Sequence, residues 1–451
     1  MKKLYRFLDE RLGLEAFANF WLRKLLPPST NWLFTLGGAA FFLFVVQIVT
    51  GIFLALYYAP TPNGAYASVT YIQEKVLFGK IIRGIHNWAA SFLMVIVPVH
   101  LLRVFFWGAY KKPRELTWIM GVFLFLLTAA FAFTGYLLPW DQKGYWATVV
   151  GTNMMGLVPL VGEYILKIVR GGMELGALAL TRFYAVHVLI LPALLIFFLC
   201  LHLFLISKHG SAGSWDENKN DLSRGFPFYP KQAARDLVVA FLLVSALLLL
   251  AWRIGAPLDD MADPTDETYI PRPDWYFLFL FQMLKYFPGR WEIVGALVLP
   301  GLFVAFLLLL PFIDQKPRKA PYRRPLALLF GGGAVFGFVL LTLLALKDDL
   351  KIRAAQAEAV RFDPTWAAEG ERLFVENGCD GCHLEGGRKA GTGPSLIGAG
   401  RRHPQAWMIQ HFKDPQSLSP GSKMPRFDYL REDEMIKLIH YIKSLKRLPS
   451  N

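Results

Sequence analysis

The sequence predicts an all-α protein in which a polytopic membrane helical bundle of about seven spans is followed by a small soluble all-α domain. Three observations predict this class. The 451-residue chain is 54% hydrophobic, with a mean hydropathy of +0.37. Seven apolar runs are each long enough to cross a hydrocarbon core of about 30 Å. Residues 366–446 instead contain short amphipathic patterns with helical spacing.

The expected spans occupy residues 32–58, 84–106, 116–138, 183–206, 236–254, 291–313 and 326–346. Because their number is odd, the two termini are expected on opposite sides of the membrane. Lys and Arg are concentrated in the N-terminal segment and in the second, fourth and sixth loops, so the positive-inside rule predicts a cytoplasmic N-terminus. The net charge of +14 follows from this bias and from contact with anionic lipid. We therefore expect no nucleic-acid binding.

Two of these spans each carry a pair of histidines, His86/His100 and His187/His202. Separations of 14 and 15 residues place each pair within about 60° of one helix face and roughly 21–23 Å apart along the axis. Ionisable residues inside a membrane are costly and usually functional, and imidazole ligates haem iron axially. Two parallel helices with two such pairs can clamp two haems, one near each surface. The alternative is that each histidine is a hydrogen-bonded residue of the protein core. This alternative is reasonable for any one of the four, but it does not account for four histidines at matched depth.

Near the C-terminus, Cys379-Asp-Gly-Cys382-His383 forms C-x-x-C-H, the c-type haem attachment sequence. Both thiols would bond to the haem, and His383 would be the proximal ligand. The alternatives are a zinc knuckle and a redox disulfide. Zinc would need two further Cys or His nearby, and the remaining cysteine, Cys200, lies within an apolar span. Bacteria attach haem c on the outer face, which agrees with an exported C-terminal domain of a bacterial inner-membrane protein.

The sixth ligand of this haem c is predicted to be Met424, in the loop Ser422-Lys423-Met424-Pro425. A thioether in a Pro-flanked loop can reach the open face of the iron. The other candidates fit less well. Met408 and Met435 occupy helical positions typical of core packing. His403 and His411 are the least favoured candidates for the sixth ligand.

Glycines repeat the histidine spacing in two other spans: Gly37/Gly51 in the first and Gly121/Gly135 in the third. Glycine lets a flat macrocycle approach a helix backbone. The alternative is small-residue helix packing, but the matched spacing favours haem contact.

Three arginines lie close to the histidines in sequence: Arg83, Arg103 and Arg182. They could pair with haem propionates. Positive residues at the ends of spans are also ordinary topology signals, so both readings stay open.

The tetrapeptide Pro273-Asp274-Trp275-Tyr276 falls in the fifth loop, on the expected outer side. An acid beside aromatic residues at the membrane surface could accept a proton from a quinol hydroxyl. The alternative is a polar cap on the loop.

Over residues 1–346 the chain resembles the cytochrome b of quinol–cytochrome c oxidoreductases (cytochrome bc complexes), and over about 366–446 a monohaem cytochrome c. Residues 1–210 are similar to the shorter chloroplast-type cytochrome b, which implies a four-helix core that holds the two haems. Residues 211–346 are similar to the small subunit that accompanies it, which implies a three-helix region. Residues 347–365 would be a linker and 366–451 the cytochrome c domain. The resemblance rests on the histidines, the glycines and three segments: GYLLPWDQKGYWA (135–147), TRFYAVH (181–187) and PDWYFLFLFQMLKYFP (273–288).

The sequence departs from the family in three respects. The family tetrapeptide is usually PEWY, so Asp274 keeps the carboxylate on a shorter side chain. Thr35 stands where the chloroplast-type protein has a cysteine that binds an extra haem. No iron–sulfur ligand set is present, because only three cysteines exist and two belong to the C-x-x-C-H motif.

The resemblance implies a function for each site. His86 would pair with His187 near the outer surface, and His100 with His202 near the cytoplasm. Quinol would be oxidised on the outer side, between the end of the third span, residues 139–156 and Asp274, Trp275 and Tyr276. One electron would pass to a separate Rieske iron–sulfur protein and on to a haem c. The other would cross two haems b to a cytoplasmic-side quinone site, where Asp236 would deliver protons with Lys208 or His209.

The expected cofactors are two non-covalent haems b, one covalent haem c and quinol/quinone, with a faint indication of menaquinone. The expected assembly is a homodimeric complex with the Rieske protein and with further cytochrome c subunits or a terminal reductase or oxidase. Two other functions are each compatible with part of the sequence. A di-haem conduit without quinol bifurcation accounts for the haem motifs but not for the PDWY loop. A proton-relaying transporter or channel predicts no haem b.

Overall fold

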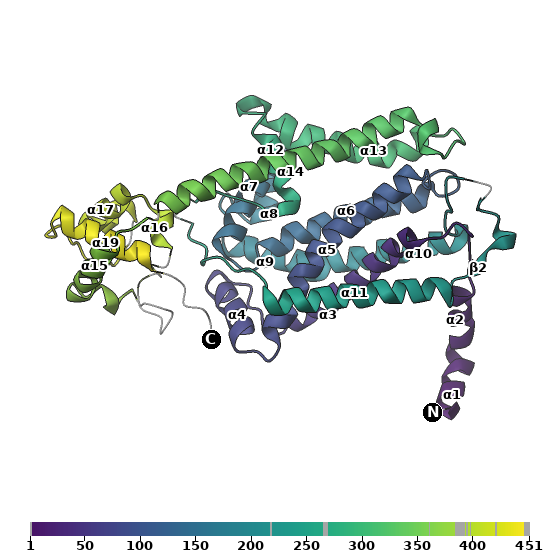
Figure 1. Cartoon of the computed structure of the whole chain (residues 1–451), viewed down its shortest axis with the longest axis horizontal. Coiled ribbons are helices and arrows are strands. Elements are labelled where there is room, and N and C mark those ends of the chain that lie inside the picture. Colours follow the sequence, from purple (N-terminus) through teal and green to yellow (C-terminus); the bar gives the residue numbers. More distant parts are fainter. Residues whose placement is uncertain are drawn as a thin grey trace. The chain divides into compact units, whose positions relative to one another are not determined.

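The computed structural model describes residues 2–216, 219–264, 269–359, 361–383, 393, 396, 398–419 and 422–445. The chain divides into two compact units. One comprises Met1–Ala262 with Pro271–Thr342, and the other Asp263–Ile270 with Leu343–Asn451. Regular structure in both is almost entirely helical (Figure 1), so the predicted all-α class is confirmed.

Seven helices of the described chain are long and apolar enough to cross a membrane, as predicted. The first four are α3 (Thr35–Ala55), α5 (Gly79–Phe106), α6 (Glu115–Tyr136) and α9 (Ala177–Ala185) continued through a π-helical turn into α10 (Leu191–His209). The other three are α11 (Lys231–Arg253), α13 (Leu299–Ile313) and α14 (Pro325–Ala359). The predicted linker, 347–365, begins inside α14, because its Ala-rich sequence favours continuing the helix.

The first four spans form the predicted four-helix core. α3 packs on α5, α5 on α6, and α6 on α10 (Figure 1). Small and large side chains alternate in the interior, where Ala40, Leu43, Ala89, Leu93 and Leu195 are buried. α11 joins this core through a close approach at Gly84, where an added Cβ would lie 2.7 Å from that of Ala251.

Shorter elements complete the membrane unit. The helices among them are α1 (Lys2–Leu12), α2 (Leu14–Leu22), α4 (Pro62–Glu74), α7 (Gln142–Gly156), α8 (Gly162–Arg170) and α12 (Leu278–Leu284). Two short strands, β1 (Leu25–Leu26) and β2 (Phe226–Pro227), pair antiparallel. This pairing ties the N-terminal segment to the loop before α11.

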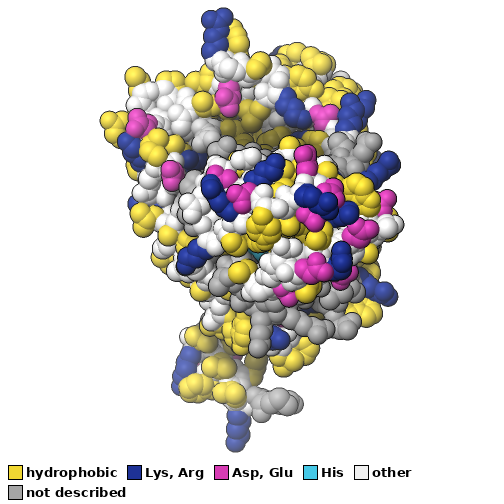
Figure 2. All heavy atoms as spheres, turned by 90° about the vertical axis from the view of Figure 1, so that its left-hand side faces the viewer, with side chains coloured by type: hydrophobic (Ala, Val, Ile, Leu, Met, Phe, Trp, Pro, Cys, Tyr) yellow, Lys and Arg dark blue, Asp and Glu magenta, His cyan; other side chains and the backbone are white. Residues whose placement is uncertain are grey.

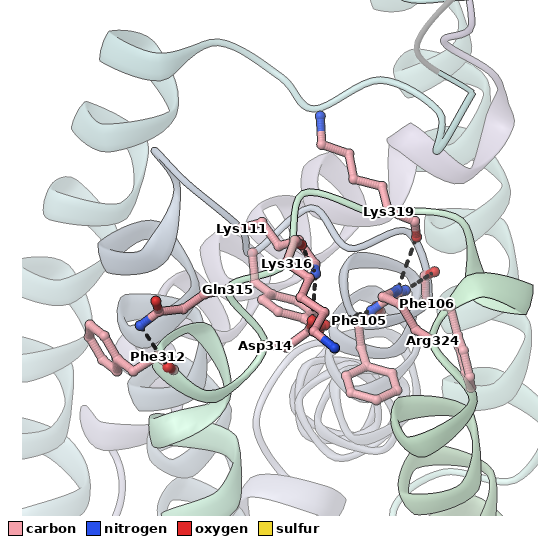
Figure 3. A network of polar contacts seen from close by, with 10 residues as sticks. Phe105, Phe106, Lys111, Phe312, Asp314, Gln315, Lys316, Lys319 and Arg324 are labelled. Atoms are coloured by element: carbon pink, nitrogen blue, oxygen red, sulfur yellow. Dashed lines mark hydrogen bonds and ion pairs between the residues drawn. The ribbon is translucent and has the colours of Figure 1, made fainter.

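A buried polar network joins the loop after α5 to the loop before α14 (Figure 3). Asp314 pairs with Lys111 at 2.6 Å and accepts a hydrogen bond from Tyr110 at 2.5 Å. Arg324 lies 3.5 Å from Asp314 and donates to the carbonyls of Phe105 and Phe106. Burial alone would raise the pKa of Asp314, but the donors from Lys111 and Tyr110 hold it below its usual value. The pair is therefore intact at neutral pH and is lost only as pH falls through that lowered pKa.

The second unit contains the C-terminal cytochrome-like domain. Its main helices are α15 (Pro364–Glu376), α17 (Gln405–Lys413) and α19 (Glu432–Ser444), with the short helices α16 (Ala399–Arg402) and α18 (Pro415–Leu418). α15 and α19 cross at Gly370, where an added Cβ would lie 2.1 Å from the carbonyl oxygen of Lys437. Met408 and Met435 are both buried in the core, as expected.

Acidic and basic side chains are interspersed on the face of the molecule shown in Figure 2. In this domain they form ion pairs, among them Lys437–Glu369 at 2.6 Å and Arg426–Asp414 at 2.9 Å. Such exposed pairs contribute little to stability.

Candidate functional site

One pair of imidazoles, His86 and His187, faces across the four-helix core. His86 of α5 and His187 of the π-helical turn have ring centroids 6.5 Å apart. Two metal–nitrogen bonds of about 2 Å and two ring radii of about 1.2 Å would place the centroids about 6.4 Å apart. The observed spacing therefore suits a single metal ion, such as a haem iron, held between the two rings.

In three of the four histidines the second ring nitrogen lies within hydrogen-bond distance of a partner that can orient the ring. Thr50 Oγ1 lies 2.9 Å from His86 Nδ1, and Thr134 Oγ1 lies 2.9 Å from His187 Nδ1. His202 Nδ1 lies 3.0 Å from the carbonyl oxygen of Thr117. Such partners fix a ring and leave Nε2 for the metal. The sequence analysis missed both hydroxyls, although each threonine immediately precedes one of the spaced glycines.

Each of the four glycines lies against one histidine ring. A Cβ added at the glycine would lie 3.3 Å from His100 at Gly37, 3.4 Å from His86 at Gly51, 3.5 Å from His202 at Gly121 and 2.7 Å from His187 at Gly135. The nearest atoms to these positions belong to the ring rather than to a neighbouring helix backbone. This arrangement favours glycines that make room at the histidines over glycines that only pack helices together.

The arginines near the histidines contact backbone oxygens. Arg83 is buried and donates to the carbonyls of Ala256 and Pro257 at 2.9 and 2.8 Å. The Arg103 guanidinium lies over the Phe34 and Trp107 rings at 4.0 and 4.1 Å. Arg182 likewise donates to carbonyls of α8. Pairing of these residues with haem propionates stays a prediction.

Asp274 stands in a polar cluster assembled from distant parts of the chain. Its Oδ1 lies 2.5 Å from Lys143 Nζ of α7, and its Oδ2 accepts a hydrogen bond from Tyr276 at 3.2 Å. Tyr276 is buried, whereas Trp275 is 38% exposed. Burial, and then the negative charge of Asp274, raises the pKa of Tyr276 well above its usual value, so the phenol stays a neutral donor. Lys143 falls within the 135–147 segment, but the sequence analysis assigned it no role.

Asp236 lies in the second turn of α11 and faces α3. Its Oδ1 accepts a hydrogen bond from Gln232 Nε2 at 3.0 Å, and its carboxyl carbon lies 3.4 Å from a Cβ position built on Gly38. Gly38 adjoins Gly37, which contacts the His100 ring. Asp236 thus packs on the segment of α3 that faces His100. Lys208 and His209 end α10, and their cooperation with Asp236 stays a prediction.

The C-x-x-C-H motif forms a 3₁₀ turn at Cys379–Gly381, and the His383 N–H donates to the Cys379 carbonyl at 2.8 Å. Cys379 and Met424 both pack against the core of the second unit. Burial, and then the charge of Asp380, raises the pKa of the Cys379 thiol to about 11.

The two histidines considered as outside candidates for the sixth ligand lie on either side of Trp407. His403 and His411 stack on its ring, with centroids 3.8 and 4.7 Å away. The identity of the sixth ligand stays a prediction, with Met424 as the first candidate.

Comparison with known proteins places both units. Residues 22–210 match the family described as Cytochrome b/b6/petB, residues 261–360 match Cytochrome b(C-terminal)/b6/petD, and residues 367–446 match Cytochrome c. Cytochrome b6 of Porphyra purpurea is 45% identical over 213 residues, which are 47% of this chain and 99% of that protein. This chain belongs to the cytochrome b family. Cytochromes b6 of Euglena gracilis and Chlamydomonas reinhardtii are 42% and 43% identical, with the same coverage.

A solved structure entitled "Hyperthermophilic respiratory Complex III" is also similar, with a TM-score of 0.68 and 28% identity. The similarity covers 76% of this chain and 91% of that one. As a cytochrome b with a fused cytochrome c domain, the chain carries two non-covalent haems b and one covalent haem c. It is a multi-pass membrane protein with a redox role in electron transport.

Proposed function

We propose that the chain is the cytochrome b/c fusion subunit of a respiratory quinol:cytochrome c oxidoreductase of the bacterial inner membrane. Quinol would be oxidised on the outer side, and electrons would cross to a quinone site near the cytoplasm. The observation that carries this proposal is the Asp274–Tyr276 hydrogen bond, in the same compact unit as the His86–His187 pair and as His100 and His202. The N-terminus would be cytoplasmic and the cytochrome c domain on the outer face. A dimeric complex with a separate Rieske protein would complete the enzyme.

Each haem has a proposed set of protein ligands. His86 and His187 would hold the outer haem b, and His100 and His202 the inner one. Cys379 and Cys382 would attach the haem c, with His383 and Met424 as axial ligands. When bound, these haems supply one-electron transfer steps. Thr50 and Thr134 would orient the outer imidazoles through their Nδ1 atoms.

At the outer site, the chain's own residues would handle the proton. The Asp274 carboxylate would accept a proton from quinol, and the Tyr276 hydroxyl would hold that carboxylate in place. At the cytoplasmic side, Asp236 and its partner Gln232 would serve the quinone site.

Purification of the intact complex from native membranes would test this proposal. We expect a co-purifying Rieske protein, haems b and c in a ratio of about two to one from the ligand sets, and quinol-dependent reduction of a cytochrome c acceptor. A preparation with that haem ratio but with neither the Rieske protein nor this activity would instead indicate a di-haem conduit.

Met424→Ala should leave haem c covalently attached and lower its reduction potential. The thioethers and His383 remain, whereas thioether ligation is what raises the potential. The measurements are a haem stain on a denaturing gel and a redox titration. Met408→Leu, in the domain core, is the matched control and should keep the potential. An unchanged potential in Met424→Ala would move the sixth ligand elsewhere.

A further inference from the structure

We propose that Lys143 is a positioning residue that gates Asp274, so that its ammonium must leave the carboxylate for a quinol proton to be accepted and returns once that proton has passed to the outer water. This inference rests on the proposed function and assigns the residue that controls its proton step. The charged end of Lys143 lies 2.5 Å from Asp274 Oδ1, although the two residues are 131 positions apart in the chain.

Both oxygens of the carboxylate are engaged. Tyr276 donates to Oδ2 at 3.2 Å, and Lys143 donates to Oδ1 at 2.5 Å. Tyr276 is 7% exposed and fixed in the turn, whereas the Lys143 side chain is 35% exposed on a flexible stem. Of the two partners, Lys143 is therefore the one that can withdraw.

The position of Lys143 in its helix also favours a pair with Asp274. Lys143 lies in the first turn of α7, where the helix dipole disfavours a positive charge. The backbone there is fixed: Asp141 caps the helix through Gly144 N–H at 2.8 Å, and Gln142 N–H donates to the Asp260 carbonyl at 2.8 Å. The fixed backbone keeps this cation near the positive end of the helix dipole, and the negative charge of Asp274 offsets that unfavourable position.

The other titratable and charged groups near this pair are few in the part of the chain that the structure describes. The Tyr136 ring at the end of α6 lies 5.6 Å from Lys143 Nζ, and its hydroxyl donates to the Arg272 carbonyl at 3.3 Å. The Arg272 guanidinium lies over the Phe281 ring at 5.3 Å. Lys143 is thus the cation in contact with the Asp274 carboxylate.

The proton step balances without a further reactant. One of the two quinol O–H bonds breaks as Lys143 withdraws, and its proton bonds to Asp274 Oδ1; the second proton leaves with the electron that passes to the Rieske protein of the proposed function. The electrons leave the quinol for the Rieske cluster and the outer haem b of the proposed function. A protonated carboxyl no longer attracts the ammonium, so the pair re-forms only when the proton passes to the outer water.

The test is the pH profile of quinol-driven haem b reduction in the intact complex, measured for Lys143→Gln, Lys143→Met and Lys143→Arg. The Gln and Met variants remove the positive charge that lies 2.5 Å from the Asp274 carboxylate, and an opposite charge at such a distance favours the ionised form of an acid. The acid side of the profile should therefore move up by about 0.5–1 pH unit in the Gln and Met variants, a modest shift because the pair is partly exposed. Lys143→Arg should keep the wild-type profile. Lys167→Gln removes the exposed Lys167–Glu163 pair of α8 at 2.6 Å and should also keep it.

Assembly of each variant is checked by its haem ratio, and Asp274→Asn is measured in parallel. If Asp274→Asn is slow but Lys143→Gln and Lys143→Met both keep the wild-type profile, the gate is wrong while the proposed function stands. If Asp274→Asn oxidises quinol at the wild-type rate, Asp274 is not the proton acceptor of the proposed function, and the proposed role of Lys143 is wrong as well. In the Asp274→Asn background, Lys143→Gln should shift nothing.

Discussion

Replacing Asp274 with Asn should slow quinol-driven reduction of the outer haem b about 100-fold. The amide keeps the size of the carboxyl group and one oxygen that can accept from either Lys143 or Tyr276, but it cannot accept a proton. Proton acceptance by a positioned side chain is worth about 10²–10⁴-fold. We expect the lower end, because the Asp274 side chain is 28% exposed and water can replace part of its role. Stopped-flow measurement with reduced quinol would give the rate.

Two matched variants separate this effect from general damage. Glu163→Gln neutralises another lysine-paired carboxylate, in α8, and should leave the rate unchanged. Asp236→Asn should show the reverse pattern: haem b reduction from the cytoplasmic quinone site slows, and quinol oxidation on the outer side does not. Turnover of Asp274→Asn within about twofold of wild type at every pH would show that the tetrapeptide only caps its loop, since loss of an acid–base group costs far more.

Gly135→Leu should eliminate the outer haem b. Even a Cβ at this position would lie 2.7 Å from His187 Cε1 and 3.3 Å from both ring nitrogens. A leucine side chain would push the imidazole away from His86, and iron would lose one of its two axial ligands. The ratio of haem b to haem c should fall from about two to about one, and quinol-driven electron transfer across the membrane should stop. A pyridine haemochrome assay measures the ratio directly.

Gly301→Leu in α13 is the control for this substitution. It adds the same side chain to another membrane helix, at a site where nothing lies within 4 Å of the new Cβ. It should retain both haems b. If Gly135→Leu also keeps both haems with an unchanged spectrum, Gly135 only serves helix packing.

Much of the fold was predictable because its signals are local. Apolar runs of spanning length identified all seven membrane helices. The extent of the helix that leads into the linker was harder to predict. The predicted linker, residues 347–365, overlaps α14, which continues to Ala359, because helix propensity in an Ala-rich segment persists beyond the apolar stretch.

The candidate site was predictable only in part. Asp274 and the four histidines were recognisable from their residue type and setting. Lys143 was not, because a lysine in a loop-to-helix segment is ordinary until its partner is known. The threonines that orient His86 and His187 were missed for the same reason: a hydroxyl in a membrane helix usually bonds to its own backbone.

The sequence by itself determined the number of membrane-spanning helices, the spacing of the histidines along two of them and the haem c attachment motif. These features depend on helix pitch and on the chemistry of residues that are neighbours in the chain. Only the tertiary structure decided which glycine meets which histidine, and that Lys143 and Tyr276 hold the two oxygens of Asp274. Such contacts join residues far apart in sequence, and they exist only once the packing of the helices brings those residues within hydrogen-bond distance.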